Sequence, residues 1–404
     1  MTRAILIGLL LASAGPLAAK TIAVAPSADM REAIQTALLD AKSGDVVLLP
    51  AGTFSLTNSL SLDVDGVTVR GAGPDKTILS FKAQTQAGEG MLVTSSRVLL
   101  EGFAIEDTHG DGIKAKGADR ISFKNLRVEW TGGAKATNGA YGVYPVTSTN
   151  VLIDTVTVRY CSDAGIYVGQ SRNIVVKNSL VEFNVAGIEI ENSMNADVHD
   201  NVAQRNTGGI LVFDLPNLPQ MGGHSTRIFN NRIVNNDTPN FAAKGAIVAS
   251  VPMGVGIMVM ANRNVQVFGN TLDNNATAGV MIVAYPLAVE DVRYNPLPRN
   301  VFVGANSFGK SGWAPDFVGG KELAAAVGGA LPPVVWDGVE SWTVKGETRG
   351  ESAKPGFAGG QLLSFGLVVA SRDRTSAKPA MVAVAATPVE TPSPVILPSD
   401  QPGL

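Results

Sequence analysis

The sequence predicts an all-β solenoid, in which short strands wind into a stack of similar coils, and two rows of residues predict it. A glycine followed by a branched aliphatic residue recurs at steps of 30, 23, 22, 22, 47 and 23 residues. A second row of turn residues follows a similar step, and a period near 22 residues indicates one repeated structural unit. The glycine-aliphatic repeat comprises Gly112-Ile113, Gly142-Val143, Gly165-Ile166, Gly187-Ile188, Gly209-Ile210, Gly256-Ile257 and Gly279-Val280.

The residues between these marks indicate which unit repeats. Segments such as 173–178 and 150–154 are short, rich in β-branched residues and bounded by turn formers, as strands are. Three strands of about four residues with their turns fill about 22 residues, one coil of a parallel β-helix, and about nine or ten coils fit between Phe54 and Phe308. The aliphatic residues of the repeat are expected to stack as the core. Within the second row, a stacked amide ladder is expected of Asn178, Asn201, Asn231 and Asn270.

The composition suits one long, turn-rich domain and limits its partners. The 404 residues include 44 glycines, 45% hydrophobic residues and 17% charged residues, as in a solenoid with a long core. A formal charge of −3 provides no basic field for nucleic acid. The alternation inside the coils leaves no apolar run long enough to cross a membrane. We therefore expect neither nucleic-acid binding nor membrane insertion after signal cleavage.

The first 19 residues have the pattern of an export signal. Arg3 precedes the apolar run 4–11, and small residues lead to an expected cleavage site after Ala19. We therefore expect a periplasmic or secreted protein exported by a Gram-negative bacterium. The single cysteine, Cys161, allows no intrachain disulfide. After cleavage, an amphipathic helix over 29–41, with Asp29 as its N-cap, is expected to cover the open end of the solenoid.

Two sets of segments carry resemblances to known families. Residues 43–54, SGDVVLLPAGTF, and 65–79, DGVTVRGAGPDKTIL, resemble the opening of β-helix proteins of the pectin-lyase-like superfamily. That resemblance implies a right-handed, three-stranded parallel β-helix. The blocks 209–216, 240–252 and 256–261 look like an uncharacterised bacterial family of exported parallel β-helix repeat proteins, over roughly residues 20–310. Genes of that family often accompany one for a haem-binding exported protein, which implies a periplasmic haem protein as a partner.

The chain divides where the repeat changes. We predict a signal peptide over 1–19, the β-helix domain over 20–310, a C-terminal extension that packs on the solenoid over 311–370, and a disordered Pro/Ala-rich tail over 371–404. Leu331–Trp336 is a candidate docking strand within the extension. The two long steps of the repeat carry insertions at 131–140, 214–224 and 237–254. Such insertions either wall a cleft or serve as packing loops.

The outward positions of the repeat strands provide candidate ligand contacts. Residues two and four places after each glycine point away from the core and are expected to face solvent. Aromatic rings beside charged groups suit a sugar, because rings stack on pyranose faces and charges bind hydroxyls or carboxylates. Ordinary alternation of polarity on a solenoid surface accounts for the same pattern without a ligand. The candidate substrate-binding residues are Lys114, Lys116, Tyr144, Tyr167, Glu189 and Glu191, with Asp214 and His224 of the inserted loop.

A glycine-rich turn before the first strong coil supplies candidate catalytic residues. Asp107, His109 and Asp111 lie within this turn, where carboxylates suit Ca²⁺ and an Asp with a His suits acid–base chemistry. Asx-rich turns also pack without any ligand, so the metal ligands stay undefined. By resemblance to pectate lyases, in which an arginine removes the C5 proton, Arg159 or Lys114 is a candidate for that role, and the two together could neutralise a uronate.

The catalytic motifs of characterised superfamily members are not intact in this chain. Alginate epimerases carry Tyr-Gly-Ile followed by Asp-Pro-His-Asp, whereas this chain reads YGVYPVT over 141–147, and polygalacturonase motifs match poorly. The sequence therefore favours a noncatalytic polysaccharide-binding protein or a periplasmic scaffold or maturation protein. The alternative is a carbohydrate-active enzyme, of polysaccharide lyase or epimerase type, that acts on an acidic polysaccharide. Whether the protein is an enzyme stays open at this point.

Overall fold

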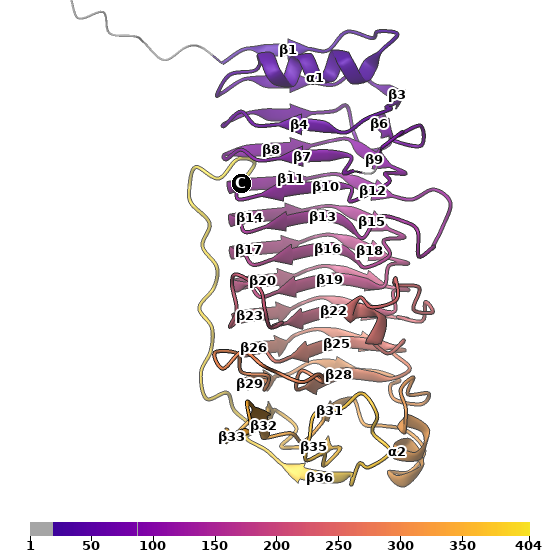
Figure 1. Cartoon of the computed structure of the whole chain (residues 1–404), viewed down its shortest axis with the longest axis vertical. Coiled ribbons are helices and arrows are strands. Elements are labelled where there is room, and N and C mark those ends of the chain that lie inside the picture. The colour runs from indigo at the N-terminus through magenta and orange to yellow at the C-terminus, as the bar shows by residue number, and fades with distance from the viewer. Residues whose placement is uncertain (1–18, 87) are drawn as a thin grey trace, which may run out of the picture.

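The computed structural model describes residues 19–86 and 88–404, and these residues form one long stack of β-coils (Figure 1). Three sheets run along the stack, and each coil passes from a strand of sheet C to one of sheet A and then one of sheet B. The predicted parallel β-helix is confirmed, since strands of successive coils pair in parallel throughout the repeat. The predicted signal peptide, apart from Ala19, lies outside the described residues.

The bounds of the strands follow the three sheets. Sheet A contains, in spatial order, β1 (Thr21–Ala23), β2 (Val46–Leu48), β5 (Thr68–Arg70), β8 (Val98–Glu101), β11 (Asp119–Lys124), β14 (Thr149–Asp154), β17 (Arg172–Lys177), β20 (Met194–His199), β23 (His224–Phe229), β26 (Arg263–Phe268), β29 (Arg299–Val303) and β34 (Gly356–Phe357). Sheet B contains β3 (Gly52–Ser55), β6 (Thr77–Ser80), β9 (Ala104–Glu106), β12 (Arg127–Glu129), β15 (Thr157–Arg159), β18 (Leu180–Glu182), β21 (Val202–Gln204), β24 (Arg232–Val234), β27 (Thr271–Asp273) and β30 (Ser307–Phe308).

Sheet C carries the glycine-aliphatic repeat. Its strands are β4 (Leu60–Leu62), β7 (Met91–Val93), β10 (Ile113–Lys116), β13 (Tyr141–Val146), β16 (Ala164–Gly169), β19 (Ala186–Glu191), β22 (Gly208–Phe213), β25 (Val255–Met260), β28 (Ala278–Val283), β31 (Val334–Trp336), β35 (Gln361–Ser364) and β36 (Ala380–Ala383). The remaining elements are the hairpin β32 (Ser341–Val344) and β33 (Glu347–Gly350), the helices α1 (Met30–Asp40) and α2 (Gly320–Ala326), and a 3₁₀ turn at Ile247–Ser250.

The stack is longer than the nine or ten coils predicted, because sheets A and C each contain twelve strands. The extra strands lie beyond the clear repeat: β1 and β2 at one end, and β31, β34, β35 and β36 at the other. β31 lies within the candidate docking strand and pairs in parallel with β28. The last strand, β36, pairs with β35 in the antiparallel sense and ends the sheet. In the described part of the chain, no helix is long and apolar enough to span a membrane.

The aliphatic residues of the repeat form the core, as predicted. Ile113 is in register with Val143, then Ile166, and the row continues to Val280 of β28. Each is at most 1% exposed, so adjacent coils bury one another's apolar faces along the whole stack. Burial of one such side chain stabilises the fold by about 1.5–3 kcal/mol.

The N-terminal helix covers the first coil, as predicted. Asp29 caps α1 by accepting a hydrogen bond from the backbone N–H of Glu32, and Met30, Ile34 and Leu38 are buried against the core. The side-chain amide of Gln35 both donates to and accepts from the backbone of Ser61 in β4. This amide therefore replaces a missing strand at the edge of sheet C, where open peptide groups would otherwise invite aggregation.

Two buried asparagine ladders run along the turns, and only part of one was predicted. Asn201, Asn231 and Asn270 each donate from the side-chain amide to the next carbonyl oxygen, and Asn306 ends that row. Asn178 does not belong to it, because it occupies the preceding, left-handed turn position with φ +53°. A second ladder, which the sequence analysis missed, stacks Asn184, Asn206, Asn236 and Asn275.

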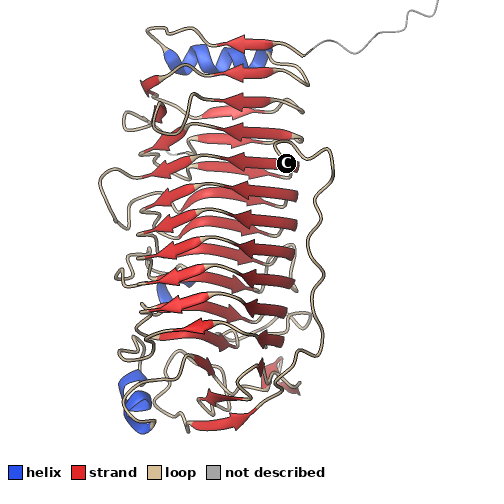
Figure 2. Cartoon of the chain, turned by 180° about the vertical axis from the view of Figure 1, so that it is seen from behind, coloured by secondary structure: helices blue, strands red, loops and turns tan. Residues whose placement is uncertain are grey.

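The chain beyond β36 has a defined course, which differs from the disordered tail expected. Residues 387–404, called the strap below, run back along the outer face of sheet A until the C-terminus lies near β8 and β11 (Figures 1 and 2). Leu397 packs on Leu152 and Val175, and Gln401 donates to the backbone oxygen of Ile121. Proline-rich chain cannot build a core of its own, but here the solenoid supplies the partners.

Candidate functional site

The outer face of sheet C changes character along the stack. The column two places after the repeat glycines runs from Lys114 through Tyr144 and Tyr167 to Glu189, and then becomes apolar at Leu211 and beyond. Insertions reach both edges of this sheet: 131–140 and 235–254 on the side of sheet B, and 214–223 and 284–298 on the side of sheet A. The polar part of the face is the candidate site.

The candidate site is a tyrosine–carboxyl cluster. It contains six of the predicted residues and three others, and its members come from β10, β13, β16, β19, the turns before β10 and β16, and the turn before β7. The cluster comprises Glu89, Asp111, Lys114, Tyr141, Tyr144, Asp163, Tyr167, Glu189 and Glu191.

The three tyrosines form one aromatic group at the centre of the cluster. The ring centroid of Tyr141 lies 4.6 Å from that of Tyr144 and 4.3 Å from that of Tyr167, and the latter two rings meet edge to face at 5.0 Å. The ammonium group of Lys114 lies 4.9 Å from the Tyr144 ring centroid. Tyr141 and Tyr144 are partly exposed, so their rings can offer a surface to a ligand.

Hydrogen bonds from two of these tyrosines hold carboxyl groups. The Tyr167 hydroxyl donates to Glu191 Oε1 over 2.6 Å, and the Tyr141 hydroxyl points to Asp163 Oδ2 at 3.5 Å. The backbone N–H of Tyr141 donates to Asp111 Oδ1 over 3.2 Å. The aromatic group thereby fixes the positions of the acids around it.

Burial raises the pKa values of several acids of the cluster toward 7. Burial raises the pKa of Asp163 to about 7, and the Glu191 charge adds to the rise while the Tyr141 hydrogen bond opposes it. Burial likewise raises the pKa of Glu191 to about 7, against the hydrogen bond from Tyr167. The pKa of Asp111 is raised by burial to about 6, although Lys114 favours the charged form. Such values let a carboxyl group donate or accept a proton near pH 7.

Glu189 is the most unusual member of the cluster. Its side chain is 1% exposed, and neither carboxyl oxygen has a hydrogen-bond partner within the described part of the chain when both it and Glu191 are ionised. Burial first, and then the charges of Asp163 and Glu191, raise the pKa of Glu189 well above its usual range. A proton shared between Glu189 and Glu191, two places apart on one face of β19, removes the conflict.

The burial of this region corrects one sequence expectation. Tyr167, Glu189 and Glu191 were expected to face solvent, but they are 5%, 1% and 6% exposed. They do point away from the core, as their strand positions predict, and β22 covers them from the next coil with Leu211 and Phe213. Only the Lys114 end of the cluster is open, where Lys114 and Glu89 are about one-quarter exposed.

The predicted turn residues are separated from one another. The Asp107 carboxylate accepts hydrogen bonds from the backbone N–H and the hydroxyl of Thr131, at 2.7 Å and 2.6 Å, and so anchors the 131–140 insertion. The His109 side chain is exposed, and its backbone N–H donates to Gln84. Asp111 alone joins the cluster. Lys116 is exposed at the end of β10.

Arg159 lies on sheet B, away from Lys114. Its guanidinium pairs with Glu129 at 3.1 Å and with Glu182 at 2.8 Å, in a row of ion pairs that links β12, β15 and β18. This geometry gives Arg159 a structural role between coils. The structure does not bring it to the candidate site.

Asp214 and His224 lie at the two ends of one insertion. The Asp214 carboxylate accepts from the backbone N–H groups of Gly222 and Gly223, which closes the 214–223 loop. His224 begins β23 in sheet A, and its Nδ1 lies 2.8 Å from the Ser225 hydroxyl. Both residues therefore shape the edge of sheet A rather than the tyrosine group.

No group of three or more His, Cys, Asp or Glu side chains suited to a metal ion occurs within residues 19–86 and 88–404. Asp107 and Asp111, the carboxylates for which Ca²⁺ was one possibility, accept hydrogen bonds from different partners, Thr131 and Tyr141.

Glu89, Tyr141 and Asp163 were missed from the sequence. The residues before the repeat glycines read Asp111, Tyr141, Ala164, Ala186 and Gly208, so a bulky pair interrupts a row of small residues. That contrast is a signal for Tyr141. Asp163 and Glu89 lie in turns outside the repeat columns, and nothing in the sequence pattern aims them at sheet C.

The comparisons with known proteins agree with this architecture. A family model described as "Right handed beta helix region" matches residues 89–251. The match covers less than half of the chain, and the strand topology shows that the described residues as a whole have the fold of a right-handed parallel β-helix. None of the curated proteins compared with this β-helix protein matches its sequence.

Several solved structures share the β-helix fold at low identity. The mannuronan C-5 epimerase AlgE4 A-module of Azotobacter vinelandii is 14% identical, with 76% of this chain and 87% of that chain covered and a TM-score of 0.50. The catalytic unit of the GH87 α-1,3-glucanase of Streptomyces thermodiastaticus is 17% identical, with coverages of 82% and 62% and a TM-score of 0.53. An alginate lyase of Paenibacillus sp. is 17% identical, with coverages of 72% and 97% and a TM-score of 0.46. These likenesses concern the fold alone.

Proposed function

We propose that the protein is a carbohydrate-active enzyme whose substrate lies on the open end of the tyrosine–carboxyl cluster. The observation that carries the proposal is the group of buried acids with pKa values of about 6 and 7, packed against three tyrosines on the outer face of sheet C. Strongly raised pKa values and partners placed to cause them are typical of catalytic sites. These acids favour the enzyme hypothesis, which the sequence alone had placed second to a noncatalytic binding or scaffold protein.

The charges of the cluster argue against an acidic substrate. Its carboxyl groups belong to Glu89, Asp111, Asp163, Glu189 and Glu191, while its one cation, Lys114, already pairs with Glu89 at 3.3 Å and lies 3.8 Å from Asp111. Arg159, the second cation expected to neutralise a uronate, lies on sheet B. A uronate would meet further negative charge here, so a neutral or amino-sugar glycan is the substrate class that fits.

Hydrolysis is the chemistry that such acids support. In our proposal the protonated carboxyl of Asp163 donates its proton to the glycosidic oxygen, and the Asp111 carboxylate accepts a proton from the attacking water. The buried Glu191 charge helps keep the pKa of Asp163 high, so Glu191 is a positioning residue. The rings of Tyr141 and Tyr144 supply stacking for a sugar face.

The comparisons supply coarser support. The epimerase module and the α-1,3-glucanase unit with TM-scores of 0.50 and 0.53 both act on polysaccharides by their descriptions. A β-helix with a partly exposed pair of tyrosines beside acids is consistent with a carbohydrate-related role for this chain as well.

The test is an assay of the mature protein against neutral glucans, partly deacetylated chitin and polyuronates. Reducing ends report hydrolysis, and ultraviolet absorbance reports unsaturated products of elimination. We expect reducing ends without unsaturated products, from a neutral or amino-sugar glycan. Asp163→Asn should lower the rate at least about 100-fold, the usual contribution of a general acid. Glu191→Gln should move the alkaline limb of the pH profile to lower pH, because the pKa of Asp163 falls.

The matched control is Asp40→Asn, since Asp40 is exposed at the end of α1. It should leave the rate unchanged. Cleavage of uronates alone, or full activity of Asp163→Asn, would reject the proposed chemistry. Binding of a glycan without any product would instead support the noncatalytic polysaccharide-binding role.

We also propose export, with cleavage after Ala19. The ordered strand β1 begins at Thr21, and the backbone N–H of Lys20 donates to Asp45 Oδ1 over 3.0 Å. Cleavage would make that nitrogen a charged amine beside a carboxylate, a favourable pair. N-terminal sequencing of protein from the periplasm and medium should begin at Lys20. Co-purification with a haem protein from the same fraction tests the proposed partner, and protein that stays in the cytoplasm with residue 1 intact would contradict export.

A further inference from the structure

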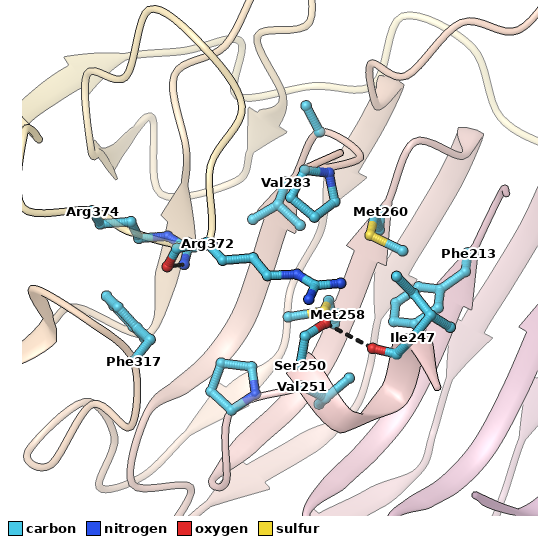
Figure 3. A pocket seen from close by; sticks show the side chains of 13 residues that line it. Phe213, Ile247, Ser250, Val251, Met258, Met260, Val283, Phe317, Arg372 and Arg374 are labelled. Carbon is cyan, nitrogen blue, oxygen red and sulfur yellow. Dashed lines mark hydrogen bonds between the residues drawn. The ribbon is translucent and has the colours of Figure 1, made fainter. Parts of the chain in front are cut away.

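Further along the outer face of sheet C, in the coils that follow the tyrosine–carboxyl cluster, lies an apolar pocket. The columns that hold Glu189 and Glu191 in β19 continue as Met258 and Met260 in β25. The 237–254 insertion and the C-terminal segments cover these methionines and enclose a cavity of about 480 Å³ that includes its open mouth (Figure 3). Its apolar lining comes mainly from Phe213, Ile247, Val251, Met258, Met260 and Val283.

One guanidinium group extends across this apolar lining. Arg372 is exposed, and its side chain reaches over the pocket toward Met258 (Figure 3). Within the described residues no ion pair of Arg372 is found, whereas Arg299 of sheet A pairs with Glu351. The backbone oxygen of Arg372 accepts a hydrogen bond from Arg374 Nη1 over 3.0 Å. Arg374 is itself 8% exposed, with its guanidinium 4.7 Å from the Phe317 ring, so the base of Arg372 is held in place.

A second apolar cavity continues from the first. It measures about 1010 Å³ including open solvent, and it shares Ala284 and Pro286 with the Arg372 pocket. Large aliphatic side chains stand exposed on its rim, with Leu287 at 49% and Val368 at 79%. Exposed apolar surface next to an enclosed pocket marks a binding site more often than a bare surface does. The two cavities together make a groove, and the side chains of Arg372 and Arg374 both line its first part, with Arg372 the exposed one.

We infer that this groove binds an amphipathic anion, a single acyl chain that ends in a carboxylate. The apolar lining takes the chain, and the Arg372 guanidinium, free of an acidic partner, pairs with the carboxylate through a charge-assisted bond. Without open solvent, the second cavity has about 460 Å³ of room, which is within the range of small-molecule sites, and the Arg372 pocket adds about 50 Å³. The site is independent of the proposed glycan chemistry, because no residue of the tyrosine–carboxyl cluster lines it.

The experiment measures binding of three probes by calorimetry, each below its micelle concentration. The mature protein should bind laurate, and it should bind dodecyl maltoside and dodecyltrimethylammonium at least about tenfold more weakly, since one charge-assisted contact is worth about that factor. Arg372→Gln should weaken laurate binding about tenfold and leave maltoside binding unchanged. Ser250→Phe, which fills the mouth of the pocket, should weaken all three probes.

The matched control is Arg232→Gln, because Arg232 is an exposed arginine on sheet B. It removes the same charge and should leave laurate binding unchanged. Absence of laurate binding by the wild-type protein, equal binding by Arg372→Gln, or equally tight binding of dodecyl maltoside would each overturn the inference. Laurate binding by a protein that cleaves no glycan would reject the proposed hydrolysis and keep this site.

Discussion

Two acids on β19, Glu189 and Glu191, make the stability of the fold depend on their protonation state. Glu189 and Glu191 are both nearly inaccessible, and among residues 19–86 and 88–404 only Tyr167 donates a hydrogen bond from outside the pair. Two ionised carboxylates in such a place would repel each other and lack solvation. The folded protein therefore holds at least one proton on the pair at neutral pH. That proton is released only at a cost in stability.

This arrangement predicts a pH-dependent effect of Glu191→Gln on stability. The pKa of Glu191 is about 7 in the folded chain and near 4.5 in the unfolded chain, so the folded state binds the proton more tightly. Stability from this group is complete below about pH 4.5 and is lost as pH rises through 7. Glutamine cannot ionise. The variant should melt at a higher temperature than the wild type at pH 8.5 and at a similar temperature at pH 5.

Asp154→Asn serves as the reference for this measurement, because Asp154 belongs to sheet A and lies outside the cluster. The difference between its melting temperature and that of the wild type should not grow from pH 5 to pH 8.5 in the stabilising direction. A Glu191→Gln variant that is equally destabilised at both pH values would contradict a protonated pair.

For single residues, the repeat correctly predicted which way the side chains of sheet C point, but it failed to predict how deeply they are buried. It placed Lys114, Tyr144, Tyr167 and Glu189 on one outward column, and the structure confirms that column. Their exposure depends on side chains from other coils, such as Leu211. A period identifies which way a side chain points. It contains no information on what covers it.

Among the elements, the turns between strands determine how well one coil follows the next. A left-handed residue and a ladder asparagine occupy adjacent positions, as Asp200 with φ +55° and Asn201 do. The ladder asparagine accepts a hydrogen bond from the preceding coil and donates to the next one. Each turn thus satisfies its buried peptide groups only when both neighbouring coils are present.

Asn231→Ala tests this dependence. The Asn231 amide donates to Val198, Phe229 and Asn270, and its carbonyl oxygen accepts from Asn201. The residue is 2% exposed, so alanine would leave several buried groups unpaired and should destabilise the fold by about 3 kcal/mol. Urea unfolding followed by circular dichroism measures the change.

The neighbouring turn row provides the comparison for that experiment. Asn178 has φ +53°, which glycine adopts freely, and its side chain makes one exposed hydrogen bond to Asp154. Asn178→Gly should change stability by less than about 0.5 kcal/mol. Equal effects of the two substitutions would mean that the ladder adds nothing beyond the turn conformation.

The cap helix and the asparagine rows show which elements a sequence pattern can predict and which it cannot. The cap helix was predicted because Asp29, Met30 and Ile34 form a local signal within one segment. The asparagine rows were merged, since the left-handed position and the ladder position differ by one residue and both accept asparagine. Two rows with the same residue type and the same period are separated only by geometry.

In the whole molecule, the strap joins coils that are otherwise connected only through their neighbours. Gln266 of β26 donates to Thr391, the backbone N–H of Val395 donates to Asp197 of β20, and Gln401 reaches Ser122 of β11. Contacts of this kind are separated by up to 280 residues in the sequence. They could not be predicted from a composition that is typical of disorder.

Removal of the strap should weaken the stack from outside. A chain that ends at Ala386 keeps the bond between Phe357 and Ala385 but exposes Leu152 and Val175. We expect a loss of about 2–4 kcal/mol from the hydrogen bonds and apolar contact together. Hydrogen exchange should rise most in β11, β14 and β17, which the truncated segment covers.

A pair of adjacent residues tests whether the contact itself is responsible. Leu397 is 9% exposed, whereas Ile396 is 85% exposed. Leu397→Ser should reproduce part of the loss, and Ile396→Ser should have no effect. Identical behaviour of the two variants would show that the strap contributes no specific packing.

The strap also fixes the number of coils between its two points of attachment. It is joined to the last coils through β36 and to β11 through the ion pair of Arg120 with Asp400, and its extended backbone has a fixed reach. Deleting one coil would shorten the stack by about 4.8 Å, and duplicating one would lengthen it equally. Either change would shift Gln401 and Leu397 off their sites. In most solenoids each repeat contacts only its neighbours, so a repeat can be gained or lost. In this one, the contacts of the strap fit only the present number of coils between β11 and β36.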